Sequence, residues 1–392
     1  MLVNNIADKL ESPLSQWQEN RAKSITFIVT EDCQLRCNYC YMVGKNKRSK
    51  MDFSIAKKTV DYLINNRETF PEKSVIWDFI GGEPFLEIEL IDEISDYIKR
   101  ITYEESHPWF DSYRLNFSTN GLLYDNEKVQ KYISKNKSHV EIGISIDGTE
   151  QKHNLQRVFP NGRGSYKEVA KNIPLWLEQF PNASTKVTIA SEDVPYIKDS
   201  VLHLFSLGIK SVNINAVFED VWKENDDKLF EEQLIKLADS IIEQKLYKDF
   251  KCSFFNKTIG NPLDCILNNQ NWCGAGKMLC VDHTGDFYPC VRFAPFSLQN
   301  KIPRIVGNCF DGMDHNKLRP FLTLDMSTQS PQKCMDCDIA AGCAWCQAAN
   351  YDFAETDTIY QRVTYICKIH KARVRANNYF WHKMDRKLAA FN

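Results

Sequence analysis

The sequence contains no long apolar run, and this absence excludes a whole class of proteins. No stretch of about 18 apolar residues occurs in the 392 residues, so no membrane-spanning segment is expected. The opening residues, MLVNNIADKLESPLSQ, carry acidic and polar side chains where a secretory signal peptide needs an apolar stretch. We therefore expect a cytoplasmic protein that has no membrane partner.

A strongly basic segment is also missing. Lys and Arg number 49 against 51 Asp and Glu, which gives a formal net charge of −2 and argues against a dedicated nucleic-acid binder. Internal repeats and low-complexity segments are absent from the sequence as well. Apolar residues make up 43% of the chain, which is enough for the cores of one large domain and one smaller one.

Cysteine, in contrast, is abundant. Fourteen Cys without a signal peptide indicate a reducing compartment, where thiols bind metals rather than pair in disulfides. Cys33, Cys37 and Cys40 stand as C-x3-C-x2-C after an apolar run, and the next Cys is Cys252. One short loop could thus hold three corners of a [4Fe–4S] cube and leave its fourth iron open to a substrate. The alternatives are a zinc knuckle and a disulfide pair, although structural zinc usually takes four protein ligands.

A second motif favours the cluster. After the apolar run 75–80 the chain reads Gly81, Gly82, Glu83 and Pro84. Two glycines let backbone groups approach a ligand closely, and the carboxylate of Glu83 can accept a hydrogen bond from a ligand ammonium. With the segments 118–121 (STNG) and 145–148 (SIDG) following in order, these motifs resemble the radical S-adenosylmethionine (SAM) superfamily over roughly residues 24–220.

The resemblance implies a SAM site next to the open iron. Its residues would be Gly81, Gly82, Glu83, Pro84, Ser118, Asn120, Ser145 and Arg157. Glu83 would hold the amino group of SAM, and Ser118 and Asn120 would reach its ribose or methionyl part. Arg157 matches a position where relatives bind the SAM carboxylate; a surface Arg is the alternative.

The order of predicted elements indicates the fold. We expect strands over 25–30, 74–80, 113–118, 139–146, 184–190 and 211–218, with helices such as 54–66, 90–105, 165–180 and 194–207 between them. This alternation predicts an α/β fold with a parallel sheet. The resemblance implies a partial (β/α)6 TIM barrel, although an open doubly wound sheet would give the same pattern. The motifs follow the first four strands, at the ends where barrel active sites are built.

The character of the chain changes near residue 250, after a predicted helix over 226–246. Short segments, Gly/Pro turns and eleven of the fourteen Cys follow. We therefore divide the chain into an N-terminal extension (1–23), a radical SAM core (24–248) and a Cys-rich domain with a C-terminal helix (249–392).

Two sets of cysteines stand in this last part. Cys273 and Cys290 flank a predicted hairpin turn at 283–286. The second set is Cys334, Cys337, Cys343 and Cys346, in the spacing C-x2-C-x5-C-x2-C, followed by Cys367. Taken alone, the second set fits a zinc ribbon as well as a cluster.

Next to a radical SAM core, these sets resemble a SPASM domain, which implies two auxiliary [4Fe–4S] clusters and three clusters in all. The distal cluster would be held by Cys334, Cys337, Cys343 and Cys367, and the proximal one by Cys273, Cys290 and Cys346. The usual last spacing in that family is C-x3-C, whereas this chain has C-x2-C. The fourth proximal ligand is open: Cys265, Cys280, or none.

Most SPASM proteins modify ribosomally made peptides or proteins. The closing stretch CKIHKARVRANNYFWHKM looks most like thioether-forming maturases of the ranthipeptide or CXXX-repeat type. We therefore expect an oxidoreductase that cleaves SAM to a 5′-deoxyadenosyl radical and installs a Cys-derived thioether in a peptide. One alternative is an anaerobic sulfatase maturase that forms formylglycine, weakened by Val291 and Arg292 where that family has an Asp after the Cys. The other is a non-catalytic iron–sulfur electron-transfer protein.

Three partners are expected. The substrate would be a Cys-containing precursor peptide. Lys45, Lys47, Arg48 and Lys50 would dock a flavodoxin or ferredoxin as electron donor, unless they form an ordinary solvated loop. Only 24 residues precede the first predicted strand, so a separate leader-binding protein is possible. The catalytic residues are unknown at this stage; Asp147 and Asp286 are guesses for the general base.

Overall fold

The computed structural model describes residues 22–43, 47–263 and 273–389, so the proposed extension 1–23 lies almost entirely outside the described residues. Strands β1 (Ala22–Thr30), β2 (Ser74–Gly81), β3 (Tyr113–Thr119) and β4 (Val140–Ile144) pair in parallel in this order. Strands β5 (Ser184–Ile189) and β6 (Ser211–Ala216) pair in a second sheet. Across the seam, the Thr185 hydroxyl donates to the carbonyl of Ile144 at 2.7 Å.

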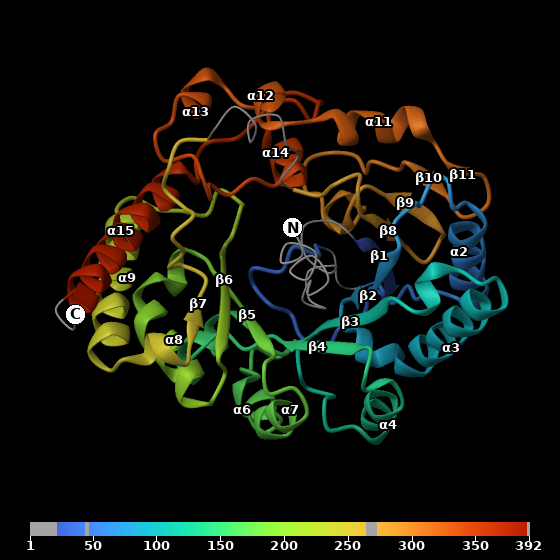
Figure 1. Cartoon of the computed structure of the whole chain (residues 1–392), viewed down its shortest axis with the longest axis horizontal. Helices are drawn as coiled ribbons and strands as arrows, with labels where there is room; N and C mark the ends of the chain where they lie inside the picture. Colours follow the sequence, from blue (N-terminus) through green and yellow to red (C-terminus); the bar gives the residue numbers. More distant parts are fainter. Residues whose placement is uncertain (1–21, 44–46, 264–272, 390–392) are drawn as a thin grey trace, which may run out of the picture.

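Helices alternate with these strands. Figure 1 shows the strands curving around the middle of the molecule with the helices on the outside. The α-helices are α2 (Phe53–Asn65), α3 (Ile88–Glu104), α4 (Glu127–Asn136), α5 (Glu150–Gln156), α6 (Tyr166–Ala170), α7 (Ile173–Gln179), α8 (Ile197–Ser206) and α9 (Asp226–Glu243). Short 3₁₀ helices are η2 (Pro84–Glu87), η3 (Pro108–Phe110), η4 (Ser191–Tyr196) and η5 (Leu246–Lys248). The predicted α/β fold with parallel strands is confirmed.

Local sequence accounts for the helix limits. The side chain of Asp52 caps α2 by accepting a hydrogen bond from the N–H of Ser54. The predicted helix over 165–180 is divided into α6 and α7, because Pro174 stands in the first turn of α7 and has no N–H to continue a preceding helix.

The core lies between the strands and the outer helices. The Phe27 ring on β1 stacks against Trp77 and Phe79 on β2, with centroids 6.0 and 5.9 Å apart, and all three side chains are fully buried. Because side chains alternate along a strand, Asp78 between them faces the opposite side of the sheet. The polar residues of these strands are thereby directed to the inside of the strand ring.

The Cys-rich part extends both sheets. Strand β7 (Lys251–Cys252) pairs with β6, and β8 (Leu279–Val281) pairs in parallel with β1. Strand β9 (Asp286–Tyr288) returns antiparallel to β8, which confirms the predicted hairpin turn. Strands β10 (Gly307–Asn308) and β11 (Gly312–Met313) complete the first sheet. Strands β7 and β8 of the Cys-rich part thus form hydrogen bonds with β6 and β1 of the preceding part. The domain boundary at 248/249 remains a prediction.

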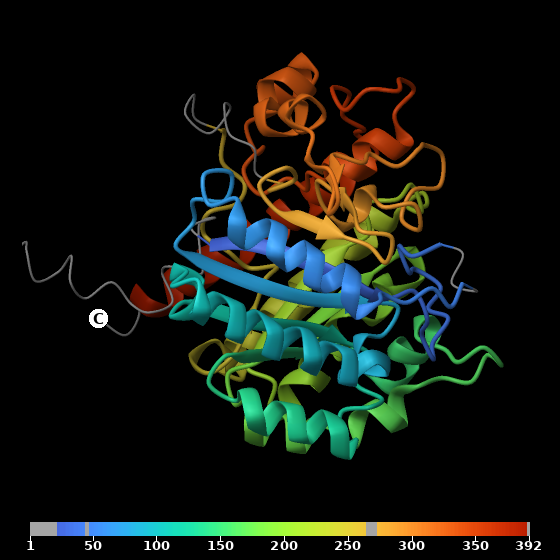
Figure 2. The same ribbon diagram turned by 90° about the vertical axis from the view of Figure 1, so that its right-hand side faces the viewer.

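Most of the remaining helices cover one end of the molecule, as Figure 2 shows for the segments coloured orange, whereas the last helix runs along the side of the strand ring (Figure 1). The remaining helices are η6 (Val291–Phe293), α11 (His315–Thr323), α12 (Met326–Gln329), α13 (Gln332–Met335), α14 (Gln347–Phe353) and α15 (Cys367–Ala389). Helix α15 packs along α9, where Lys383 and Arg375 form ion pairs with Asp239 and Glu231, each at 2.6 Å. In the described part of the chain, no helix has the length and apolarity that a membrane crossing requires.

Candidate active site and cysteine clusters

A cavity of about 500 Å³ lies at the carboxyl ends of the strands, where the motifs predict an active site. The predicted site residues that line it are Cys33, Cys37, Cys40, Gly81, Gly82, Ser118, Asn120, Ser145, Arg157 and Cys346. Val291 and Arg292 from the Cys-rich part also line it. The structure thus brings the N-terminal cysteine motif and a cysteine of the second set to one cavity.

The cysteine loop, residues 33–40, follows β1 and is held by backbone hydrogen bonds. The N–H groups of Arg36 and Asn38 donate to the carbonyls of Val158 and Gln156, at 2.7 and 2.9 Å, which ties the loop to the end of α5. The first cysteine of the loop is buried, and the other two are half-buried. Three thiols are therefore presented to the cavity from a fixed backbone.

The two glycines of the second motif pack against residues 30–32, which lead into this loop. A Cβ on Gly81 would lie 2.1 Å from the carbonyl oxygen of Thr30, and one on Gly82 would lie 2.1 Å from that of Asp32. The N–H of Gly82 donates to the Thr30 carbonyl at 2.9 Å. A side chain at either position would push the loop away. The glycines therefore serve close approach of two backbone segments, in addition to the approach to a ligand that the sequence suggested.

Glu83 is fully buried and is engaged by donors of the chain itself. Its carboxylate accepts from the hydroxyl of Thr119 at 2.6 Å and from the N–H groups of Asn120 and Phe85 at 2.7 and 3.1 Å. Burial raises the pKa of Glu83 to about 7, although these hydrogen bonds oppose the rise. A carboxylate offers about four acceptor positions, so one remains for a ligand ammonium. That contact stays a prediction. Pro84 begins η2 and is buried.

The residues predicted to reach ribose or methionine differ in their surroundings. Ser118 is exposed to the cavity, whereas Ser145 is buried. The Asn120 side chain donates from Nδ2 to Sγ of Cys33 at 3.7 Å and to Oε1 of Gln34 at 3.1 Å. Asn120 thus contacts the cysteine loop directly, and the SAM contacts of these residues stay predictions.

Arg157 is not a surface residue: it is 9% exposed and its guanidinium lies at the cavity wall. Its Nε donates to Asp147 at 3.1 Å, Lys152 Nζ lies 3.3 Å from the same carboxylate, and the Tyr39 hydroxyl donates to it too. Burial would raise the pKa of Asp147, but the charges of Arg157 and Lys152 outweigh it and hold this pKa below its usual value. Asp147 is thus committed to a buried ion-pair network and is unsuited as a general base.

Sequence reasoning missed a row of polar residues on the inside of the sheet. Asp78 on β2 accepts from Asn116 on β3 at 2.6 Å and from the Thr26 hydroxyl on β1 at 3.4 Å. Asp78, Asn116 and Lys186 on β5 all line the cavity. The available signal was the lone Asp between Trp77 and Phe79 in an apolar strand.

The three residues predicted for the proximal cluster lie together. A hydrogen bond from the Cys273 thiol and, after it, the charge of Arg292 lower the pKa of Cys346, while the same hydrogen bond raises the pKa of Cys273. Burial, followed by the charge of Cys346, raises the pKa of Cys290 to about 12. The guanidinium of Arg292 donates to Glu219 at 2.5 Å and stands 5.2 Å from the Tyr41 ring centroid.

The fourth proximal ligand is not settled by these contacts. Cys280 on β8 is fully buried and lies near Cys290, whose charge raises the pKa of Cys280 after the larger effect of burial. Cys265 lies outside the described residues. Among the described cysteines none forms a disulfide.

The four cysteines predicted for the distal cluster line one cavity. Cys334, Cys337, Cys343 and Cys367 surround a space of about 260 Å³ together with Arg362. The Nη2 of Arg362 donates to Sγ of Cys343 at 3.3 Å, a contact that suits a thiolate ligand. Within the described ranges, no group of three or more His, Cys, Asp or Glu is arranged around a single metal ion. The auxiliary cluster on these four cysteines stays a prediction.

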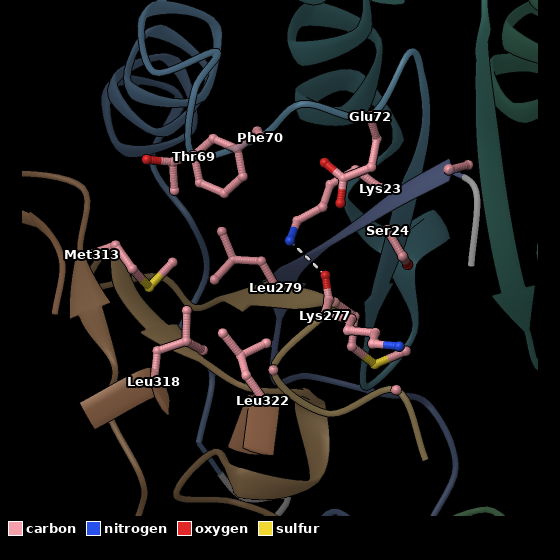
Figure 3. A pocket seen from close by; sticks show the side chains of 14 residues that line it. Lys23, Ser24, Thr69, Phe70, Glu72, Lys277, Leu279, Met313, Leu318 and Leu322 are labelled. Atoms are coloured by element: carbon pink, nitrogen blue, oxygen red, sulfur yellow. Dashed lines mark hydrogen bonds between the residues drawn. The ribbon is translucent and has the colours of Figure 1, made fainter. Parts of the chain in front are cut away.

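Another cavity, of about 200 Å³, lies at the amino ends of the strands and contains none of the predicted site residues. The Nζ of Lys23 donates to the carbonyl of Lys277 at 2.5 Å, with the Glu72 carboxylate beside it (Figure 3). Burial lowers the pKa of Lys23 although Glu72 opposes this. The contact joins β1 to the segment before β8 and serves the packing of the sheet.

Comparison with known proteins agrees with this geometry. Residues 27–191 match the family model described as the Radical SAM superfamily. The chain contains a radical SAM domain. Relatives extend beyond it. An uncharacterized protein of Methanocaldococcus jannaschii, MJ0907, is 28% identical over 68% of this chain and 84% of its own length. A serine-type anaerobic sulfatase-maturating enzyme of Bacteroides thetaiotaomicron is 22% identical over 86% of this chain and 84% of its own.

Solved structures share the fold. Native anSMEcpe with bound AdoMet and Cp18Cys peptide has a TM-score of 0.70 at 20% identity, over 95% of this chain and 100% of that chain. Streptococcus suis SuiB bound to its precursor peptide SuiA has a TM-score of 0.56 at 13% identity, over 92% of this chain and 80% of that chain. These matches include the Cys-rich part, so the fold similarity is not confined to the radical SAM domain.

The residues of the radical SAM domain fit the cofactors of its superfamily, SAM and a [4Fe–4S] cluster. Three thiols on one loop, the donors Ser118 and Asn120, and the guanidinium of Arg157 all border the same 500 Å³ space. Arg157 supplies a fixed cation for a carboxylate. Asp286, the other candidate base, stands in the β8–β9 hairpin and is not among the described residues that line this cavity.

Proposed function

We propose that the protein is a radical SAM maturase that oxidises a Cys-containing, ribosomally made peptide and installs a thioether crosslink in it. One observation carries the proposal: the three thiols of the cysteine loop and Cys346 line a single cavity. A peptide held there would lie between two iron–sulfur sites. One site would start the reaction and the other would accept an electron, which is the arrangement that a two-electron oxidation requires.

The chain's own residues would prepare the first site. The SAM-binding cluster would be held by Cys33, Cys37 and Cys40. Glu83 would bind the amino group of SAM, and Arg157 would bind its carboxylate. When bound, SAM and the reduced cluster would supply a 5′-deoxyadenosyl radical that removes a hydrogen atom from the peptide. Tyr39 of the loop packs against Arg157, with the guanidinium 5.5 Å from the ring centroid, and the pair would limit water entry beside the cluster.

The Cys-rich part would hold the two other clusters. Cys273, Cys290 and Cys346 would bind the proximal one, and the distal set would be Cys334, Cys337, Cys343 and Cys367. Arg292 contacts Tyr41 and Glu219, and its charge helps to lower the pKa of Cys346. It would therefore connect the proximal site to the peptide cavity. Electrons released by the peptide would leave through these two sites.

A second candidate, formylglycine formation, is favoured by a specific finding. Sulfatase-maturating enzymes are similar to this chain over most of its length. Against it stands the residue after Cys290, where that family has an acidic base and this chain has Val291. The next residue, Arg292, is paired with Glu219. Both candidates oxidise a peptide by two electrons, and they differ in what becomes of the substrate sulfur.

Partners follow from the same proposal. Three of the predicted docking residues, Lys47, Arg48 and Lys50, are exposed shortly after the cysteine loop. The Nζ of Lys50 lies 3.6 Å from a carboxylate oxygen of Glu87. Lys45 lies outside the described residues. These basic residues would dock an acidic flavodoxin or ferredoxin. A separate leader-binding protein would present the peptide. The compartment would be the cytoplasm, where unpaired thiols and reduced clusters persist.

The test is anaerobic turnover with defined peptides. Protein reconstituted with iron and sulfide should carry about 12 iron atoms, as three [4Fe–4S] clusters require. With SAM and dithionite it should make 5′-deoxyadenosine. A peptide with repeated Cys should lose two hydrogens per crosslink and one alkylatable thiol, measured by mass spectrometry. A product that instead loses sulfur and gains an aldehyde would establish formylglycine formation, and reduced protein that leaves SAM intact would refute both candidates.

A further inference from the structure

Asp78 holds a distinctive position in the cavity. It stands in register with Thr26 on β1 and with Asn116 on β3, and Thr26 is in turn in register with Cys280 on β8. Four adjacent parallel strands thus contribute one row of side chains at the same height. Asp78 is the acid of this row, and the two neighbours that donate to it hold its carboxylate in place.

The charges around Asp78 place it between the two cysteine sites. Lys186 on β5 and Tyr41, next to the cysteine loop, line the same cavity as Asp78. The charge of Lys186 opposes the rise in the pKa of Asp78 that burial causes, and the charge of Asp78 adds to the effect of burial on the pKa of Tyr41. Cys280 is in register with Thr26 on the neighbouring strand, and after burial the charges of Cys290 and Asp78 raise its pKa. Asp78 is therefore close to the route that joins the radical site to the proximal site.

The other carboxylates near the cavity are already engaged: Glu83 accepts from the Thr119 hydroxyl and from two backbone N–H groups, and the rest are paired with cations. Asp78 and Glu219 are the two carboxylates among the described residues that line the cavity. Glu219 is ion-paired to Arg292 at 2.5 Å, and the more deeply buried Asp147 to Arg157 and Lys152. Asp78 has no ion pair within 4 Å in the described part of the chain, since its close partners are an amide and a hydroxyl.

We propose that Asp78 is the general base that takes the proton from the substrate cysteine thiol as the carbon–sulfur bond forms. This assignment rests on the proposed function and adds to it the residue that no motif supplied. Burial raises the pKa of Asp78 to about 6, although hydrogen bonds from Asn116 and Thr26 and the charge of Lys186 oppose the rise. A carboxylate that is ionised at neutral pH and yet more basic than usual suits this task.

The step balances with the groups named. The SAM-derived radical takes one hydrogen atom from a peptide carbon. The thiol proton passes to a carboxylate oxygen of Asp78, and the sulfur, left with its electron pair, bonds to the carbon radical. One electron is then in surplus, and it needs a one-electron acceptor, which an iron–sulfur cluster on Cys273, Cys290 and Cys346 would supply. The peptide has lost two hydrogens.

The experiment compares Asp78→Asn with the wild type and with Glu141→Gln. Asn has nearly the same shape as Asp but accepts no proton here. Glu141 lies on β4, forms an ion pair with Arg114 at 3.2 Å and does not line the cavity, so its variant is a matched control. A peptide deuterated at the attacked residue separates two steps: deuterium in 5′-deoxyadenosine reports hydrogen abstraction, and the peptide mass reports crosslinking.

At pH 7 we expect Asp78→Asn to retain deuterium transfer within about twofold and to lose crosslinking by about 100-fold, the usual effect of removing a general base. Glu141→Gln should behave as the wild type. A free thiol ionises near pH 8.5 without help, so crosslinking by Asp78→Asn should rise about tenfold per pH unit up to that pH and about 25-fold between pH 7 and pH 9, to within about fourfold of the wild type. A merely structural defect would not recover in this way.

Three outcomes would overturn the proposal. Wild-type crosslinking by Asp78→Asn at pH 7 would show that no proton passes through this carboxylate. Joint loss of deuterium transfer and crosslinking, without recovery at pH 9, would give Asp78 a structural role. If the wild type itself transfers no deuterium from any Cys-containing peptide, the proposed function fails and the assignment of Asp78 fails with it. In the first two cases the proposed function stands.

Discussion

The guanidinium of Arg292 donates to the carboxylate of Glu219 at 2.5 Å, and this ion pair joins the Cys-rich part to the strand ring. Arg292 lies two residues after Cys290, and Glu219 lies just beyond the end of β6. The same guanidinium stands over Tyr41 at 5.2 Å. One cation therefore contacts residues next to both predicted iron sites.

Replacing Arg292 by Gln should lower the reduction potential of the proximal cluster, because a nearby positive charge favours the reduced form. SAM cleavage should continue while crosslinked product falls several-fold, since electrons leave the peptide less readily. Redox titration followed by electron paramagnetic resonance measures the first effect, and the ratio of 5′-deoxyadenosine to product measures the second. Arg375→Gln, at the exposed ion pair with Glu231, is the control. An unchanged potential in Arg292→Gln would contradict the assignment.

Replacing Gly82 by Ala should displace the cysteine loop. The new Cβ would lie 2.1 Å from the Asp32 carbonyl, a distance that real structures do not tolerate. We expect the variant to fold but to lose SAM cleavage at least tenfold and to bind less iron. Gly143→Ala is the control, because its Cβ would lie 3.6 Å from the nearest atom. Wild-type iron content and SAM cleavage in Gly82→Ala would refute the proposed role of the two glycines.

The stability of the metal-free protein should depend on Glu83. Burial raises the pKa of Glu83 from 4.5 to about 7. The folded state then holds a proton that the unfolded state releases, so the contribution is fully present below pH 4.5 and is lost as pH rises through 7. The loss is of the order of 3 kcal/mol. Urea unfolding at several pH values should show this decline in the wild type and a flatter profile in Glu83→Gln. Equal profiles would reject the buried carboxylate as its source.

Replacing Cys337 by Ala should remove the distal cluster alone. Total iron should fall by about 4 atoms per chain, and SAM cleavage should continue, because the cysteine loop is untouched. Cys309→Ala is the matched control, since Cys309 is buried beside Gly285 and was not assigned as a ligand. Iron analysis with absorption spectra of both variants measures the difference. Zinc in place of iron in the wild type would exclude the cluster assignment itself.

Sequence patterns were sufficient for the strands and for the cysteine motifs. The apolar run of β2 and the glycines after it fix both a strand and the place where it ends. The spacing of the cysteine loop indicates its chemistry because three thiols so close along the chain can bind the same metal cluster. These features are local, so a single sequence carries them.

Contacts between distant segments could not be predicted in this way. The pairing of β8 with β1 joins residues about 250 positions apart, and no local pattern specifies it. Asp78 was overlooked because alternation along β2 gives its direction only after the inside of the sheet is known. In the sequence, Arg292 counted only as a departure from the Asp that sulfatase maturases have near this position. The structure shows its ion pair with Glu219, which the sequence alone did not indicate.

The hydrogen bonds between β1 and β8 have a consequence for electron flow. Strand β1 leads into the cysteine loop, and β8 leads through its hairpin toward Cys290. Neighbouring strands stay about 4.8 Å apart, so the starting points of the two segments predicted to bind iron are spaced by a backbone ladder instead of a flexible linker. Tunnelling between the two metal centres would then proceed over a constant gap, and a hinge motion would not be able to switch it off.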